Sequence, residues 1–167
     1  KEWLDGVEFV GEFGLQSAPE IETTTEAMEL QAIQLGHFAT TSQLPAALEA
    51  TVFKEIIVEP QTTTDQLDAV LRDFDSHADF ILLDLARNNI SLDKLESGSV
   101  LSLAWLQQLA QRTKLLLEMN WTAALLEQVL RDIPVAGISL KGGEEEKVGY
   151  KSFDELDEIF EFLEEEV

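Results

Sequence analysis

The chain has 167 residues, enough for one domain with a sizeable core, and its 33 acidic and 11 basic side chains give it a net charge of −22. This charge argues against nucleic acids and anionic membranes as partners, because both are themselves negatively charged. The sequence contains no cysteine, which excludes disulfides, thiolate metal ligands and a cysteine nucleophile in this chain. No apolar run approaches the roughly 20 residues that span a bilayer, and no signal peptide is visible, so we expect a cytoplasmic protein.

Short apolar runs alternate with segments of helical period along the whole chain. The runs suit strands that are buried on both faces of a parallel sheet, and they lie at Val7–Phe13, Ala32–Leu35, Val52–Val58, Phe80–Leu85, Leu115–Leu117 and Val135–Leu140. The helical segments between them are Pro19–Met28, Ser42–Ala50, Thr64–Phe74, Leu101–Gln111, Thr122–Arg131 and Phe153–Glu165. Ser152 and Glu155 form a capping box at the start of the last helix. The pattern predicts one α/β domain over residues 1–167, built from about six βα units.

This alternation is compatible with two architectures. One is an open, doubly wound parallel sheet, and the other is a (βα)8 TIM-type barrel of which about six units are present in this chain. Hydrophobic periodicity does not distinguish between the two.

Several motifs resemble the phosphoribosylanthranilate isomerase family, and they occur in that family's order. They are Ala32–Leu35 followed by Gly36-His37, Lys54 in the next strand, the strand Phe80–Asp84 ending in Leu-Leu-Asp, Trp105, and Ala136–Glu144 followed by Val148–Lys151. The resemblance implies a (βα)8 barrel of tryptophan biosynthesis in which this chain holds the third to eighth strands. The first residue is Lys1 rather than Met, which agrees with an incomplete barrel that lacks its N-terminal units.

The family reaction is an Amadori rearrangement, which needs an acid at the ring oxygen and a base at the neighbouring carbon. Asp84 matches the family's general acid, and the C-terminal end of a barrel strand is where catalytic groups lie. Glu118, which follows Leu117, is a candidate replacement for the family's basic cysteine, which has no counterpart here. Asp84 could equally bind the following loop, and Glu118 could equally pair with Lys114 or Lys141.

The candidate ligand-binding residues are Gln34, His37, Arg87, Lys141, Gly142 and Gly143. Phosphate binding at the last two barrel strands needs backbone N–H groups, which glycines expose. The family has a glycine pair where this chain has Met119-Asn120, and Glu144–Glu146 follow Gly142-Gly143 directly. A carboxylate about 4 Å from a phosphate costs on the order of 1 kcal/mol in water and more when buried. We therefore expect no detectable isomerisation of phosphoribosylanthranilate and no affinity for phosphate below millimolar.

The resemblance thus implies a divergent isomerase whose activity the substitutions put in doubt. The alternative is a non-catalytic acidic barrel that binds a partner or a small ligand at its C-terminal mouth, and a doubly wound binding module is a third reading.

No metal-ligand spacing or cofactor fingerprint is present, and His77 lies in a turn before a strand, where we expect a structural role. Two unpaired sheet edges predict a homo-oligomer, or association with a missing N-terminal segment, rather than a stable monomer.

Overall fold

The computed structural model describes residues 8–141, 145–147, 150–151 and 154–165, and its centre is one parallel sheet of six strands in sequential order. The strands are β1 (Val10–Phe13), β2 (Ala32–Leu35), β3 (Thr51–Ile57), β4 (Phe80–Asp84), β5 (Leu115–Glu118) and β6 (Gly137–Ser139). A doubly wound sheet would reverse its strand order at a switch point. The order found here contains no reversal and is that of a barrel, which confirms the predicted fold class.

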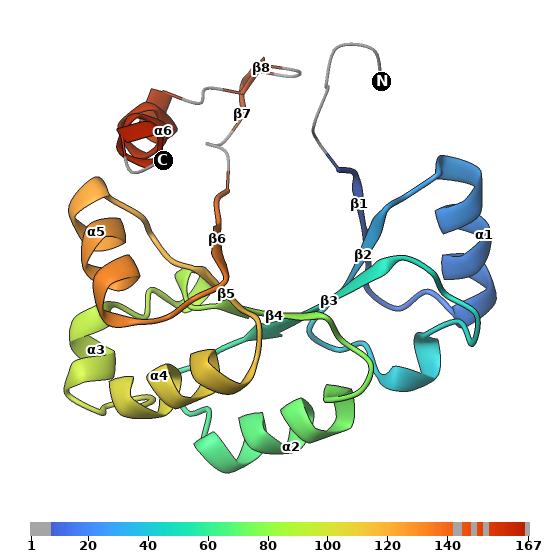
Figure 1. Ribbon diagram of the computed structural model, residues 1–167, viewed down its shortest axis with the longest axis horizontal. Helices are drawn as coiled ribbons and strands as arrows, with labels where there is room; N and C mark the ends of the chain where they lie inside the picture. Colours follow the sequence, from blue (N-terminus) through green and yellow to red (C-terminus); the bar gives the residue numbers. More distant parts are fainter. Residues whose placement is uncertain (1–7, 142–144, 148–149, 152–153, 166–167) are drawn as a thin grey trace.

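Five helices form where the periodicity predicts them, and a further short helix, Leu92–Glu96, was not predicted. They are α1 (Ala18–Met28), α2 (Thr64–Phe74), α3 (Leu92–Glu96), α4 (Leu103–Arg112), α5 (Ala123–Asp132) and α6 (Asp154–Glu165), with short 3-10 turns η1 (Thr41–Gln43) and η2 (Ala86–Asn88). Serine or threonine side chains cap several N-termini; Thr63, for example, accepts a hydrogen bond from the Gln66 amide. Figure 1 shows helices α1 to α5 on the convex side of a curved sheet. No helix in the described ranges is long and apolar enough to cross a membrane.

The prediction of a helix over Ser42–Ala50 is wrong. Only the 3-10 turn η1 forms there, and Leu44 at its end is extended, with φ −76° and ψ 126°. Pro45 explains this, because a proline disfavours helical angles in the residue before it. The Gln43 side chain then donates to the carbonyls of Gly14 and Gln16, which ties this loop to the end of β1.

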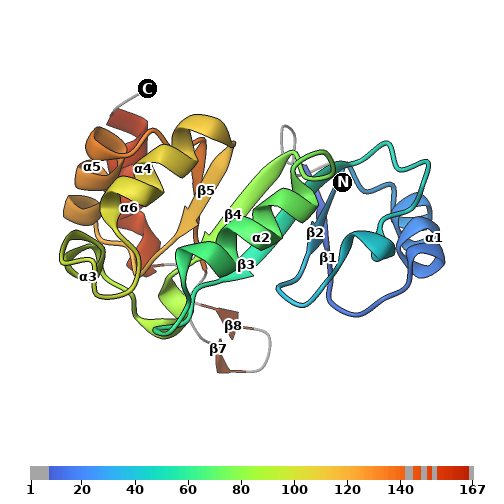
Figure 2. The ribbon, with the colours of Figure 1, turned by 90° about the horizontal axis from the view of Figure 1, so that it is seen from below.

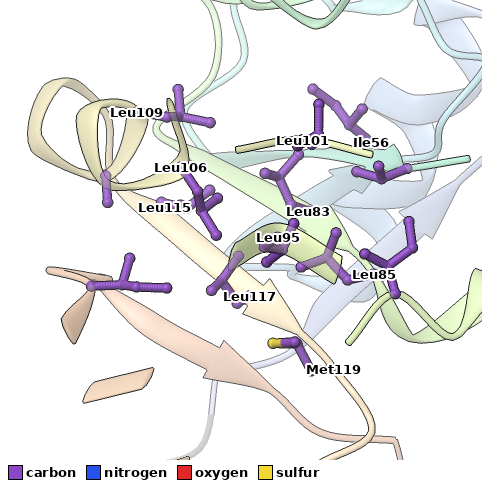
Figure 3. Close-up of a cluster of buried hydrophobic side chains, with 14 of the residues drawn as sticks. Ile56, Leu83, Leu85, Leu95, Leu101, Leu106, Leu109, Leu115, Leu117 and Met119 are labelled. Atoms are coloured by element: carbon purple, nitrogen blue, oxygen red, sulfur yellow. The ribbon is translucent and has the colours of Figure 1, made fainter. Parts of the chain in front are cut away.

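The main core lies between the convex face of the sheet and the helices. Figure 3 shows Leu83 of β4 and Leu115 and Leu117 of β5 packed with Leu106 and Leu109 of α4, and all five side chains are inaccessible to solvent. The alternation in β3 assigns the two faces, since Val52, Lys54 and Ile56 are buried whereas Thr51, Phe53, Glu55 and Ile57 are half-buried. The concave face therefore stays partly open.

The sheet does not close in the described part of the chain. β1 pairs only with β2 and β6 only with β5, and Figure 1 shows the opening between these two strands. Figure 2 shows the same arc from below, with α2 lying along β3 and β4. A small antiparallel pair that the sequence analysis did not predict, β7 (Glu145–Lys147) and β8 (Tyr150–Lys151), precedes α6. The predicted loop glycines Gly142 and Gly143 and the predicted cap Ser152 lie outside the described residues.

Candidate functional site

Two carboxylates lie side by side at the C-terminal ends of adjacent strands. Asp84 is the last residue of β4 and Glu118 the last of β5, and the strand register places them opposite each other, with Ser139 of β6 next to Glu118. Asp84 is 0 % exposed and Glu118 is 4 % exposed. Buried carboxylates of this kind must have partners, because an isolated charge is costly to bury.

Lys141 bridges the two carboxylates. Its Nζ lies 3.2 Å from Asp84 Oδ2 and forms a second ion pair with Glu118 Oε1. The other oxygen of each carboxylate is held by the scaffold: the Arg87 amide donates to Asp84 Oδ1 at 2.8 Å, and Ser139 Oγ donates to Glu118 Oε2 at 2.9 Å. Each carboxylate thus has one oxygen held by a neighbouring hydrogen-bond donor and one facing the ammonium.

The Lys141 side chain is exposed although its two partners are not. The Lys141 side chain is 62 % exposed, whereas those of Asp84 and Glu118 are almost fully covered. Partial burial lowers the pKa of Lys141, but the hydrogen bonds and charges of Glu118 and Asp84 outweigh it and raise the pKa overall. Lys141 is therefore charged across the physiological range and is the group at this site that meets solvent.

A cavity of about 420 Å³ opens on the concave side of this cluster. Its lining residues are Glu12, Gln34, Glu55, Leu82, Arg87, Glu118, Ser139 and Lys141. Of the residues predicted from sequence, Gln34, Arg87, Glu118 and Lys141 come together here, and Asp84 lies directly behind Lys141.

Glu55 is a site residue that the sequence analysis missed. Its Oε2 accepts a hydrogen bond from the His37 amide at 3.2 Å. Burial is the main cause that raises the pKa of Glu55; the His37 amide and Lys141 oppose this effect, and the negative charges of Glu12 and Asp84 add to it. The alternation within β3 could have revealed it, because Glu55 is a charged residue on the opposite face from Val52 and Ile56.

His37 does not line the cavity. Its ring Nδ1 accepts a hydrogen bond from the Ile57 amide at 3.0 Å, which ties the loop after β2 to the end of β3. Burial and the nearby charges of Lys54 and Arg87 lower its pKa, although Glu59 acts in the opposite direction. The role of His37 in this geometry is therefore structural: it fixes the loop after β2 against the end of β3.

Lys54 holds the same loop from the other side of the sheet. It is fully buried on the convex face, and its Nζ donates to the carbonyls of Gly36, His37 and Ala39 at 2.6, 2.9 and 2.9 Å. These three bonds use all of its protons, and no part of the side chain reaches the cavity.

A second pocket, of about 350 Å³, lies between the ends of β5 and β6. Its lining residues are Ala86, Glu118, Met119, Asn120, Trp121, Thr122, Leu140, Lys141, Leu156 and Ile159. The Trp121 ring is fixed, because its Nε1 donates to the Ser139 carbonyl at 2.8 Å. Asn120 donates through its side-chain amide to the Asn89 side chain at 3.0 Å.

No group of three or more His, Asp or Glu side chains that could hold a metal ion occurs in the ranges the structure describes. His77 is exposed in the turn between α2 and β4, where its ring contacts Ser76 Oγ at 3.2 Å, on the side of the sheet away from the candidate site.

Solved structures identify the fold. The phosphoribosylanthranilate isomerase of Thermotoga maritima is 17 % identical in sequence to this chain. The two structures superpose with a TM-score of 0.71, over 98 % of this chain and 76 % of that one. The corresponding enzyme from Thermus thermophilus is 24 % identical, with a TM-score of 0.68 over 99 % and 77 % of the two chains. The chain has the phosphoribosylanthranilate isomerase fold. A third such enzyme, from Pyrococcus furiosus, is 17 % identical, with a TM-score of 0.67 over 96 % and 75 %. No family model and no curated protein matches the sequence.

Proposed function

We propose that this protein is a divergent isomerase of the phosphoribosylanthranilate isomerase type, which moves protons on a sugar that carries an N-linked amine. One observation carries the proposal: Asp84 and Glu118, nearly inaccessible and from adjacent strands, share the ammonium of Lys141 at the mouth of a cavity. An acid and a base held close together at strand ends are what such a rearrangement requires.

The first step opens the sugar ring. Asp84 delivers a proton to the ring oxygen while the bond from that oxygen to C1 breaks and the amine nitrogen's lone pair forms a C1=N bond. In the free protein this proton resides on Lys141, whose raised pKa keeps it charged, so the acid is the Asp84–Lys141 pair rather than Asp84 alone.

The second step forms the enolamine. Glu118 takes the proton from C2, the C2–H electrons form a C1=C2 bond, and the C=N electrons return to nitrogen. The enolamine then loses its C2 hydroxyl proton and gains a proton at C1, which yields the ketose. Ser139 holds Oε2 of Glu118, so the oxygen that takes the proton is Oε1, which must exchange its contact with Lys141 for the C2 proton.

The test measures the fluorescence change as an anthranilate adduct is consumed, with ribosylanthranilate and phosphoribosylanthranilate as separate substrates. We expect slow turnover of the unphosphorylated compound, a loss of ~10²-fold or more in both Asp84→Asn and Glu118→Gln, and no detectable turnover of the phosphorylated one. Asp75→Asn, in the exposed turn after α2, is the control and should keep full activity. Absence of turnover with both substrates at stoichiometric protein would refute catalysis.

One feature favours the alternative, a non-catalytic barrel that binds a small ligand at its mouth. Lys141 already neutralises both carboxylates, and a structural clamp would need nothing more. Calorimetric binding of ribosylanthranilate without turnover, unchanged in Glu118→Gln, would select this alternative.

The open edges of the sheet also bear on association. β1 and β6 each have one paired neighbour in the described region, and an unpaired strand edge favours pairing with another chain. We propose that the 167-residue chain associates, either with itself or with a further βα segment. A cooperatively melting monomer in sedimentation experiments would refute this proposal.

A further inference from the structure

The pocket between the ends of β5 and β6 differs in chemistry from the mouth cavity. Most of its walls are apolar: Met119 and Trp121 follow β5, Leu140 follows β6, and Leu156 and Ile159 belong to α6. Met119 is 4 % exposed and joins the main core, where Figure 3 shows it beyond Leu117 on the core side of β5.

Among the residues that the structure describes, this pocket offers few free partners to an anion. Anion sites of this kind use exposed backbone N–H groups at a helix N-terminus. Here the Thr122 side chain accepts from the Leu125 amide at 3.2 Å, which removes one donor at the N-terminus of α5, and the Trp121 indole N–H donates to the Ser139 carbonyl. Its cation, Lys141, is already paired with two carboxylates, one of which, Glu118, is itself a wall of the pocket.

The pocket and the mouth cavity adjoin, because Glu118 and Lys141 line both. One molecule can therefore place a polar group against the Asp84–Lys141–Glu118 cluster and a second group between Met119, Trp121 and Leu156. An apolar group gains free energy by leaving water there, whereas a charged one would lose its hydration without a partner.

We propose that the pocket between β5 and β6 binds an uncharged ring, aromatic or alicyclic, and that the ligand of this protein carries such a ring where a phosphorylated sugar would carry its phosphate. This rests on the proposed function for the polar half of the ligand, but the ring pocket is defined by its own walls. The rigid indole of Trp121 supplies a flat face against which a ring can stack.

The test follows the Trp121 indole N–H resonance in ¹H–¹⁵N spectra, assigned with Trp121→Phe, during titrations with benzyl alcohol and with inorganic phosphate. We expect benzyl alcohol to shift this resonance and to saturate in the millimolar range, as is usual for a fragment of this size, and phosphate to leave it unchanged. Leu156→Asp, which places a carboxylate in the wall, should weaken benzyl alcohol binding by about tenfold or more. Leu130→Asp is the matched control, since Leu130 is an exposed residue of α5 that does not line the pocket, and its titration should equal that of the unmodified chain.

Two outcomes would overturn the proposal: a shift of the Trp121 resonance by phosphate at the same concentrations, or benzyl alcohol binding that Leu156→Asp leaves intact. Asp84→Asn separates this proposal from the proposed function. The ring pocket predicts an unchanged benzyl alcohol titration in Asp84→Asn, whereas the isomerase predicts lost turnover, so either can fail while the other holds.

Discussion

Two lysines at the mouth of this barrel have opposite surroundings. Lys54, on the convex face of β3, is 0 % exposed and gives its three protons to backbone carbonyls, while Lys141, after β6, is largely exposed and lies between two buried carboxylates. Burial lowers the pKa of Lys54 to about 8, even though Glu55 acts to raise it, whereas carboxylate contacts raise the pKa of Lys141.

These different surroundings give Lys54 a structural role and place Lys141 in the candidate site. A cation whose bonds all go to backbone fixes a loop and offers nothing to a ligand, while a solvent-exposed cation on buried carboxylates can exchange partners. The resemblance assigns a lysine to the strand that contains Lys54, but in this chain the accessible ammonium is that of Lys141.

Replacing Lys54 should have the largest effect on stability. Lys54→Met removes all three hydrogen bonds to the carbonyls of the loop after β2 and loosens that loop, so we expect the free energy of unfolding to fall by about 3 kcal/mol. Urea denaturation measures it. Lys114→Met is the control, because Lys114 is exposed and lies over the Phe80 ring, and it should cost well under 1 kcal/mol. Equal losses in the two variants would contradict a scaffold role for Lys54.

The pH dependence of stability should carry the signature of Lys54. Because its folded pKa of about 8 lies below the ordinary value of ~10.4, the unfolded chain binds more protons between these values, and the free energy of unfolding rises with pH in that window. We expect a rise of about 1 to 3 kcal/mol, absent in Lys54→Met. Lys141 acts in the opposite direction: its contribution is present below ~10.4 and is lost at higher pH. Stability that stays flat from pH 8 to 10 would contradict this assignment.

Replacing Lys141 should lower the free energy of unfolding by less than replacing Lys54 does. In Lys141→Met two adjacent buried carboxylates lose their shared cation, and allowing for the exposure of Lys141 we expect a loss of about 1 to 2 kcal/mol at neutral pH. Adding Glu118→Gln should restore part of it, because one of the two like charges is gone. Additive losses in the double variant would show that Lys141 does not couple the pair.

Replacing Ser139 should have the smallest effect on the free energy of unfolding. Ser139→Ala removes one hydrogen bond to Glu118 Oε2, for which we expect about 1 kcal/mol in denaturant experiments. Ser42→Ala, in the exposed turn η1, is the comparison and should change stability by less than half as much. A neutral Ser139→Ala would mean that the backbone of β6, rather than its hydroxyl, orients Glu118.

The sequence predicted the six strands because each is a short apolar run. It singled out Asp84 through a family resemblance and its place at a strand end, and Glu118 through its place at the next strand end. It predicted a helix over Ser42–Ala50 wrongly, since apolar spacing outweighed the local effect of Pro45. Glu55 was missed although the alternation within β3 sets it on the opposite face from Val52 and Ile56. The pairing of Glu118 with Lys141 was one of two that the sequence left open, whereas the contact of Lys141 with Asp84, 57 positions away, is one that periodicity cannot reveal.

The sequential strand order makes this fold modular. Every strand of the main sheet pairs only with strands that are its neighbours along the chain, so no pairing has to wait for distant segments to meet. Pairing between consecutive strands keeps the loops that must close shorter than in a sheet whose neighbouring strands are distant in sequence, which lowers the entropic cost of loop closure. It also means that a βα unit added at either edge would extend the arc without reordering the strands already present, so that length variation in this fold is absorbed at its margins while the strands that hold Asp84 and Glu118 keep their register.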